Sequence, residues 1–122
     1  MRQLRPRLRE ESFLERVRSL QTRGYRLAYV SAGDSPVAVA GFRIGECLAW
    51  GRFLYVDDLV TAPSVRSKGY GSCLLRWLRE VAESEGCEEM HLDSGVQRAD
   101  AHRFYEREGM QVSSYHFRFP VE

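Results

Sequence analysis

One helical stripe constrains the fold of this chain more than any other feature of its sequence. Between residues 70 and 85, apolar side chains recur at intervals of three and four, and Gly86 follows as a stop signal. Residues 53–61, shortly before the stripe, are almost continuous in β-forming side chains, which is typical of a strand in the middle of a sheet. A buried strand followed by an amphipathic helix predicts an α/β domain built around a sheet. The stripe consists of Leu74, Leu75, Leu78, Val81 and Ala82.

Weaker patterns predict the other elements. A capping box of Ser12 with Glu15 begins a first helix, and Gly24 ends it. Alternation of Tyr115, Phe117 and Phe119 with polar residues predicts a last strand. This order of elements predicts antiparallel hairpins and at least one parallel crossover. The predicted fold class is therefore mixed α/β (α+β). The expected helices cover residues 10–23, 70–85 and 99–108, and the expected strands cover residues 25–31, 36–44 with an extension at 47–50, 53–61, 89–94 and 111–119, with a hairpin turn at 33–35.

Size and charge narrow the class of protein. A chain of 122 residues predicts a single domain over residues 1–122. The balance of 18 basic against 17 acidic residues argues against a dedicated nucleic-acid binder, which would carry a strongly basic domain. No apolar run approaches the ~18–20 residues that span a bilayer, and the basic start lacks the apolar segment of a signal peptide. We therefore expect no nucleic-acid or membrane partner and a cytoplasmic location.

The three cysteines do not form a metal or disulfide pattern. Cys47, Cys73 and Cys87 show no CxxC spacing and no interleaved histidines, so neither a zinc site nor a disulfide framework is predicted. Because free cysteine is among the most buried residue types, we expect all three inside the core.

The chemistry-bearing motif lies between the central strand and the apolar helix. Arg66 to Gly71 reads R-x-x-G-x-G, and its glycines let backbone amides approach a ligand closely. The helix start adds unpaired N–H groups and a positive dipole end, while Arg66 and Lys68 add charge. This combination predicts a phosphate or pyrophosphate site. The alternative is a tight turn that uses glycine for steric reasons alone; neither a Walker A loop nor a dinucleotide fingerprint fits.

Two neighbouring carboxylates interrupt the central strand. Asp57 and Asp58 are costly to bury unpaired, so each needs a partner, water access or a shifted pKa. Because side chains alternate along a strand, the two should face opposite sides unless a bulge intervenes. They either take part in proton transfer or anchor loops and pair with arginines.

Read together, these segments resemble the GNAT superfamily of N-acetyltransferases. The resemblance covers roughly residues 25–119, and its motifs stand in the family's order. They are Leu59-Val60-Thr61, the segment Arg66-Ser67-Lys68-Gly69-Tyr70-Gly71, the apolar helix, His91-Leu92-Asp93-Ser94, and Ala101-His102-Arg103-Phe104-Tyr105-Glu106-Arg107-Glu108-Gly109-Met110. The fold that the resemblance implies is a mixed, mostly antiparallel central sheet flanked by helices.

The resemblance also implies an activity and a set of site residues. Acetyl-CoA is the implied co-substrate, and the acetyl group passes directly to a primary amine of a small molecule or protein. Tyr105 would protonate the leaving thiolate, and Asp57 or, as the second choice, Asp58 would take the proton of the amine. The pantetheine arm would pair with Leu59, Val60 and Thr61. The pyrophosphate would bind at Arg66, Ser67, Lys68, Gly69, Tyr70, Gly71 and Ser72. No metal is implied.

Two departures from the family pattern bear on this expectation. Arg98 replaces the asparagine commonly found seven positions before the tyrosine. The chain begins at the family's second helix, whereas many relatives carry a strand and a helix before it, and we therefore expect a homodimer that completes the amine pocket. The alternatives are a catalytically silent acyl-CoA-binding module and a structural interaction domain, in which Tyr105 would be an ordinary core tyrosine.

Overall fold

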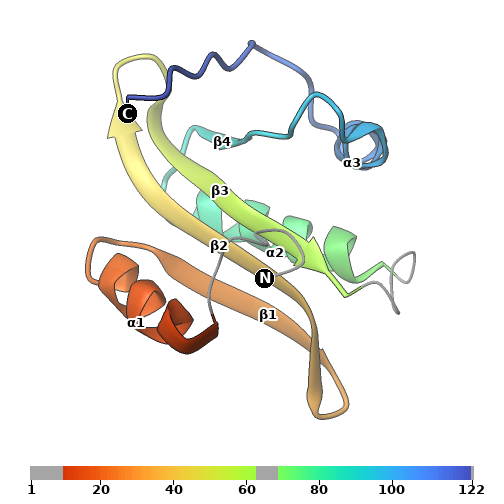
Figure 1. Cartoon of the computed structure of the whole chain (residues 1–122). Coiled ribbons are helices and arrows are strands. Elements are labelled where there is room, and N and C mark those ends of the chain that lie inside the picture. Colours follow the sequence, from red (N-terminus) through yellow and green to blue (C-terminus); the bar gives the residue numbers. More distant parts are fainter. Residues whose placement is uncertain (1–9, 63–68, 122) are drawn as a thin grey trace. The chain divides into compact units, whose positions relative to one another are not determined.

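The computed structural model describes residues 10–62 and 69–121 (Figure 1). The chain divides into two compact units, with the boundary after Leu92. The first unit contains α1 (Glu10–Gln21), β1 (Arg26–Ala32), β2 (Ser35–Cys47), β3 (Gly51–Thr61), α2 (Tyr70–Ser84) and β4 (Glu89–Leu92). The second contains α3 (Ala99–Arg107).

The first unit is built on one four-stranded sheet in the order β1-β2-β3-β4. The β1–β2 and β2–β3 pairs are antiparallel, and the β3–β4 pair is parallel with α2 as its crossover. This topology confirms the predicted mixed sheet with one parallel connection. Gly33, with a φ of 65°, begins the tight turn between β1 and β2, because that region of backbone space is open chiefly to glycine.

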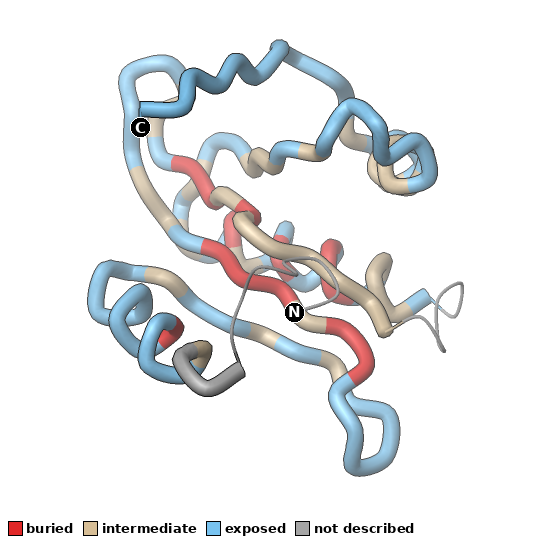
Figure 2. Tube along the Cα trace, viewed as in Figure 1, coloured by how far each residue is buried: buried red, intermediate tan, exposed pale blue. Residues whose placement is uncertain are grey.

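The core lies between the sheet and the helix α2, whose apolar stripe packs as the sequence predicts. Leu54 of β3 and Leu78 of α2 are fully enclosed, and Phe42 of β2 meets the Trp77 ring edge to face with centroids 6.1 Å apart. In Figure 2, buried residues follow one another along β2, β3 and α2. Each fully buried side chain of this size contributes about 1.5–3 kcal/mol, so the packing of α2 on β2 and β3 stabilises the unit.

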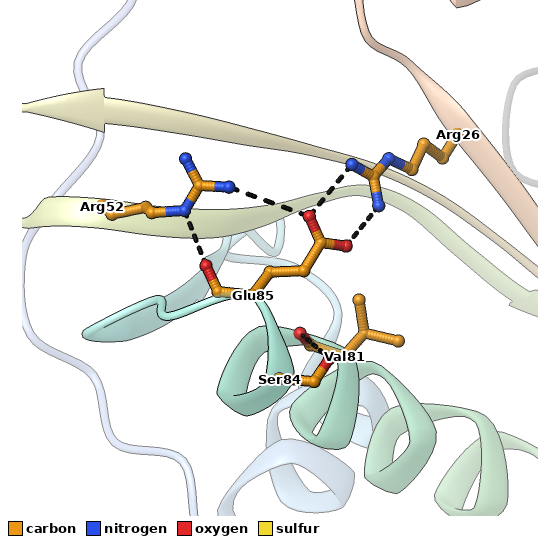
Figure 3. Close-up of polar contacts among 5 residues, drawn as sticks. All are labelled: Arg26, Arg52, Val81, Ser84 and Glu85. Carbon is orange, nitrogen blue, oxygen red and sulfur yellow. Dashed lines mark hydrogen bonds and ion pairs between the residues drawn. The ribbon is translucent and has the colours of Figure 1, made fainter.

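A carboxylate at the end of α2 joins the helix to two strands (Figure 3). Glu85 accepts two hydrogen bonds from Arg26 of β1, with N–O distances of 2.5 and 3.1 Å. Arg52 of β3 donates to the Glu85 backbone carbonyl at 2.7 Å and lies 3.7 Å from its carboxylate. The hydrogen bonds from Arg26 come first among the causes that hold the Glu85 pKa below its ordinary value.

The predicted last strand is absent from the structure. Residues 110–121 carry no helix or strand, and the side chains of Tyr115, Phe117 and Phe119 are 83, 91 and 88% exposed. Alternation of apolar and polar residues shows only that one face of a segment is apolar. The segment forms a strand when a neighbouring strand supplies partners for its backbone hydrogen bonds. In the described residues no strand pairs with this segment.

The second strand ends at Cys47, beyond the predicted end at residue 44 but short of the predicted extension to residue 50. β2 runs unbroken through Gly45 to Cys47, and residues 48–50 form a turn rather than an extension. The predicted strand stops before Gly45, whereas the observed strand continues through it. A Cβ at Gly45 would lie 2.7 Å from the Phe53 ring, so the glycine lets an aromatic side chain cross the strand.

The prediction of buried cysteines was wrong. Cys47 and Cys73 are exposed and Cys87 is half-buried. Cys47 ends β2 at a surface turn, and Cys73 precedes the buried Leu74, so it projects from the side of α2 that faces solvent. A small apolar residue is buried only where its side chain lies on the core-facing side of a helix or strand. Of the helices described, none has the length and apolar character needed to cross a membrane.

We predict that Glu85→Gln lowers the melting temperature at pH 7. Because the folded-state pKa of Glu85 is depressed, its stabilisation is complete above the ordinary carboxyl value and is lost as the pH falls through the lower folded value. Melting curves of both proteins from pH 7 to pH 3 should therefore converge at the acid end. Arg79→Gln, which disturbs only an exposed pair with Glu83 on α2, is the control. A difference that persists undiminished at pH 3 would contradict this account.

Candidate active site

A β-bulge brings the two carboxylates of β3 to one face of the sheet. Asp58 pairs with Gly41 of β2 but Val56 pairs with Phe42, so Asp57 is the extra residue of the bulge. Phe42 and Val56 face α2, whereas Gly41, and therefore Asp58, face the other side. Asp57 reaches Arg43, two residues from Gly41 on that same side. The prediction that the two side chains face opposite sides is therefore wrong, because a bulge interrupts the strand.

Each carboxylate has a partner, as the cost of burying charge required. The Arg43 Nε donates to Asp57 at 3.1 and 3.3 Å, and its guanidinium lies 4.8 Å from the centre of the Tyr55 ring. The Tyr25 hydroxyl donates to Asp58 Oδ2 at 2.7 Å. Asp57 therefore contacts the Arg43 guanidinium and Asp58 contacts the Tyr25 hydroxyl, which the sequence spacing alone does not indicate.

The strand continues past the point where its parallel neighbour ends. β4 pairs with β3 only from Phe53 to Val56. Leu59, Val60 and Thr61 are half-buried and pair on their other side with Ala40, Val39 and Ala38 of β2. Within the described residues, the ladder between β3 and β4 ends at Val56. An extended ligand backbone can add to a strand edge of this kind.

The start of α2 has the features of an anion site. Gly69 stands at the N-cap with a φ of 84°, in the left-handed region, and no side chain caps the helix in the described residues. The half-buried residues Tyr70, Gly71 and Ser72 form the first turn, which contains no acidic residue. The first amides of a helix lack partners within it and carry its positive dipole end. Arg66, Ser67 and Lys68 of the predicted site lie outside the described residues.

In the second unit, Tyr105 lies on α3 and is half-buried. Burial raises the pKa of its phenol, and the positive charge of Arg98 opposes that rise. A raised pKa keeps the hydroxyl protonated at neutral pH, which is the state that a proton donor requires. The Phe104 ring lies beside it, with centroids 5.3 Å apart.

Two further polar groups of the second unit lie outside the predicted set of site residues. The Ser94 hydroxyl is buried without a hydrogen-bond partner in the part of the chain that the structure describes. His102 Nε2 lies 2.7 Å from the Gly95 carbonyl, so that nitrogen carries the proton and donates it, tying α3 to the loop before it. Ser94 is the last residue of the segment His91-Leu92-Asp93-Ser94, but the sequence of that segment does not show that the hydroxyl is buried. Among the described residues, no cluster of histidine, cysteine, aspartate and glutamate could hold a metal ion.

Two known proteins resemble this chain in sequence. YhdJ of Bacillus subtilis (strain 168), an uncharacterized N-acetyltransferase, is 37% identical over 123 residues, which are 99% of this chain and 87% of that protein. The aminoalkylphosphonate N-acetyltransferase of Salmonella typhimurium (strain LT2) is 45% identical over 64 residues, which are 52% of this chain but only 40% of that enzyme.

The fold itself recurs in a solved structure. The structure of AAC(6')-Iy in complex with the bisubstrate analog CoA-S-monomethyl-acetylneamine matches with a TM-score of 0.82 at 17% identity, over 99% of this chain and 86% of that one. The model of the "Acetyltransferase (GNAT) family" matches residues 2–110, across both compact units. With that match over most of the sequence, the chain belongs to the acetyltransferase (GNAT) family, and acetyl transfer is its class of reaction.

Proposed function

We propose that this chain is an acetyl-CoA-dependent N-acetyltransferase that passes the acetyl group directly to a primary amine of a small molecule or protein. The observation that carries the proposal is the path of β3: its last residues extend beyond the β4 ladder and lead toward the positive end of α2. The family match spans both units, which supports the prediction that they act as one domain.

The binding part of the proposal follows from backbone groups. The pantetheine arm has amides that can pair with Leu59, Val60 and Thr61, as a strand would. The pyrophosphate binds at the first turn of α2, where Gly69 brings the backbone close without a side chain. The sequence adds the charges of Arg66 and Lys68. The bound bisubstrate analog of AAC(6')-Iy supports acetyl-CoA as the co-substrate, since the two folds match.

The chemical part of the proposal requires a base and an acid. An ammonium has no lone pair, so Asp57 or Asp58 takes a proton from the acceptor amine. The nitrogen then attacks the acetyl carbonyl carbon, the C–N bond forms, the C–S bond breaks, and the nitrogen loses its second proton to solvent to give the neutral amide. Tyr105 gives its proton to the departing thiolate, a role that its raised pKa supports. Direct transfer needs no acetylated side chain.

The activity is tested by release of free thiol from acetyl-CoA over a panel of primary amines, which includes aminoalkylphosphonates, aminoglycosides and a lysine peptide. With an accepted amine, we predict that Tyr105→Phe lowers kcat about 100-fold, the range typical of a lost general acid. The protection that CoA gives against thermal unfolding should stay within about twofold of the parent's apparent affinity. Tyr115→Phe, at an 83% exposed position of the same unit, is the matched control. Equal kcat values for Tyr105→Phe and the parent would remove Tyr105 from this role.

The pyrophosphate site is tested by comparing Gly69→Asp with Gly69→Asn, two variants that have nearly the same shape and differ in charge. Asn and Asp both tolerate the left-handed conformation of Gly69, and a Cβ there meets nothing within 4 Å. We predict that Gly69→Asp weakens CoA binding about tenfold more than Gly69→Asn does, because a carboxylate repels the phosphates. In the absence of CoA, Gly69→Asp should melt no lower than Gly69→Asn, since an acidic N-cap suits the helix dipole. Equal CoA affinity for the two variants would place the phosphates elsewhere.

A further inference from the structure

A run of exposed apolar side chains follows α3 in the second unit. Residues 111–121 are exposed throughout, and Figure 2 shows them as a drawn-out trace. At four of these positions the side chain is large and apolar and is between 83 and 96% exposed. Side chains of this kind are ordinarily buried, so a contiguous set of them on a surface indicates contact with another molecule. The four residues are Tyr115, Phe117, Phe119 and Val121.

These four side chains form one face of the segment, which we call the aromatic face. They stand at every second position, and in an extended chain every second side chain points to the same side. His116 stands between two of them and points the other way, since its Nδ1 lies 3.4 Å from Asp93 Oδ1, within the same unit. The polar side of the segment therefore contacts its own unit, and the aromatic face points away from that contact.

The chemistry of the aromatic face suits a second copy of itself. The face contains no charged residue, because Arg118 stands on the other side of the segment with His116. A two-fold axis brings identical residues of two copies together, so a charge close to the axis would repel its own counterpart. An uncharged, aromatic face carries no such penalty, and it offers a charged partner nothing to pair with.

The size of the aromatic face also fits a pair of copies. A buried aromatic side chain removes about 150–250 Å² of surface from water, so three from each copy bury about 900–1,500 Å² before Val121 is counted. Specific protein–protein interfaces begin at about 1,200 Å² in total. The face is therefore large enough for a dimer of two identical chains.

We propose that the aromatic face is a dimer interface that packs against the same face of a second copy, around a two-fold axis at Phe117. Antiparallel packing about that residue places Tyr115 of each copy opposite Phe119 of the other. A shift by two residues in either direction would leave one aromatic side chain of each copy without an aromatic counterpart. The homodimer that the sequence predicts thus has a specific interface, and the inference goes beyond the proposed acetyl transfer and does not depend on it.

The test measures the mass of the purified chain by analytical ultracentrifugation over a range of concentrations. Because interfaces of this kind bind with micromolar or tighter affinity, the parent should be a dimer at about 100 µM. Phe117→Glu should raise the dissociation constant of the dimer about 100-fold or more, since it removes the central aromatic side chain and sets two carboxylates face to face. Tyr115→Phe, which keeps its ring, should remain dimeric.

The matched control adds the same charge to the other side of the same segment. Val112 is 77% exposed and stands an even number of positions from His116, so its side chain lies on the polar side. Val112→Glu should change the dissociation constant less than about threefold, because an exposed charge outside the contact is screened by salt.

A charge swap separates a direct contact at position 117 from a general loss of structure. Phe117→Lys alone should be as monomeric as Phe117→Glu, whereas an equimolar mixture of the two should form mixed dimers, because opposite charges then meet across the axis. A parent that is monomeric at about 100 µM leaves the face to another partner and overturns the proposal. An undiminished dimer in Phe117→Glu, a mixture that stays monomeric, or a parent mass that rises without limit above two chains overturns it as well.

Discussion

The antiparallel ladder between β2 and β3 is the constraint on which the rest of the first unit depends. On one face it supplies Phe42, Leu54 and Val56 to the core beneath α2. On the other face it carries Arg43 and, after the bulge, both aspartates. A regular ladder would send one of the two carboxylates into the apolar core, where an unpaired charge is costly. The bulge lets β3 carry two acidic residues in succession and still bury its apolar positions.

The same ladder sets where a ligand backbone can bind. β2 extends along the whole of β3, but β4 stops opposite Val56, so the end of β3 extends past its parallel neighbour, and α2 is the next element of the chain. Because α2 must bury Leu74, Leu75 and Leu78 against the sheet, its N-terminus is fixed relative to β3. Core packing and the candidate cofactor site are thus consequences of one strand–helix connection.

Much of this was predictable from local patterns. The stripe from Leu74 to Ala82 and the β-rich run to Thr61 predicted α2 and β3, because apolar spacing is a property of neighbouring residues. The expected strand around Phe117 and the expected burial of Cys47 and Cys73 were wrong. A strand needs a pairing partner, and burial needs a second surface, and neither is encoded in the segment itself.

The sequence by itself determined which residue types were available: a glycine at the start of the amphipathic helix, and two successive aspartates in a β-rich run. Only the tertiary structure decided that those aspartates share a face and that one meets Arg43 while the other meets Tyr25, 33 residues away. The physical reason is that a bulge is a relation between two strands. Its position depends on which residues of β2 stand opposite β3.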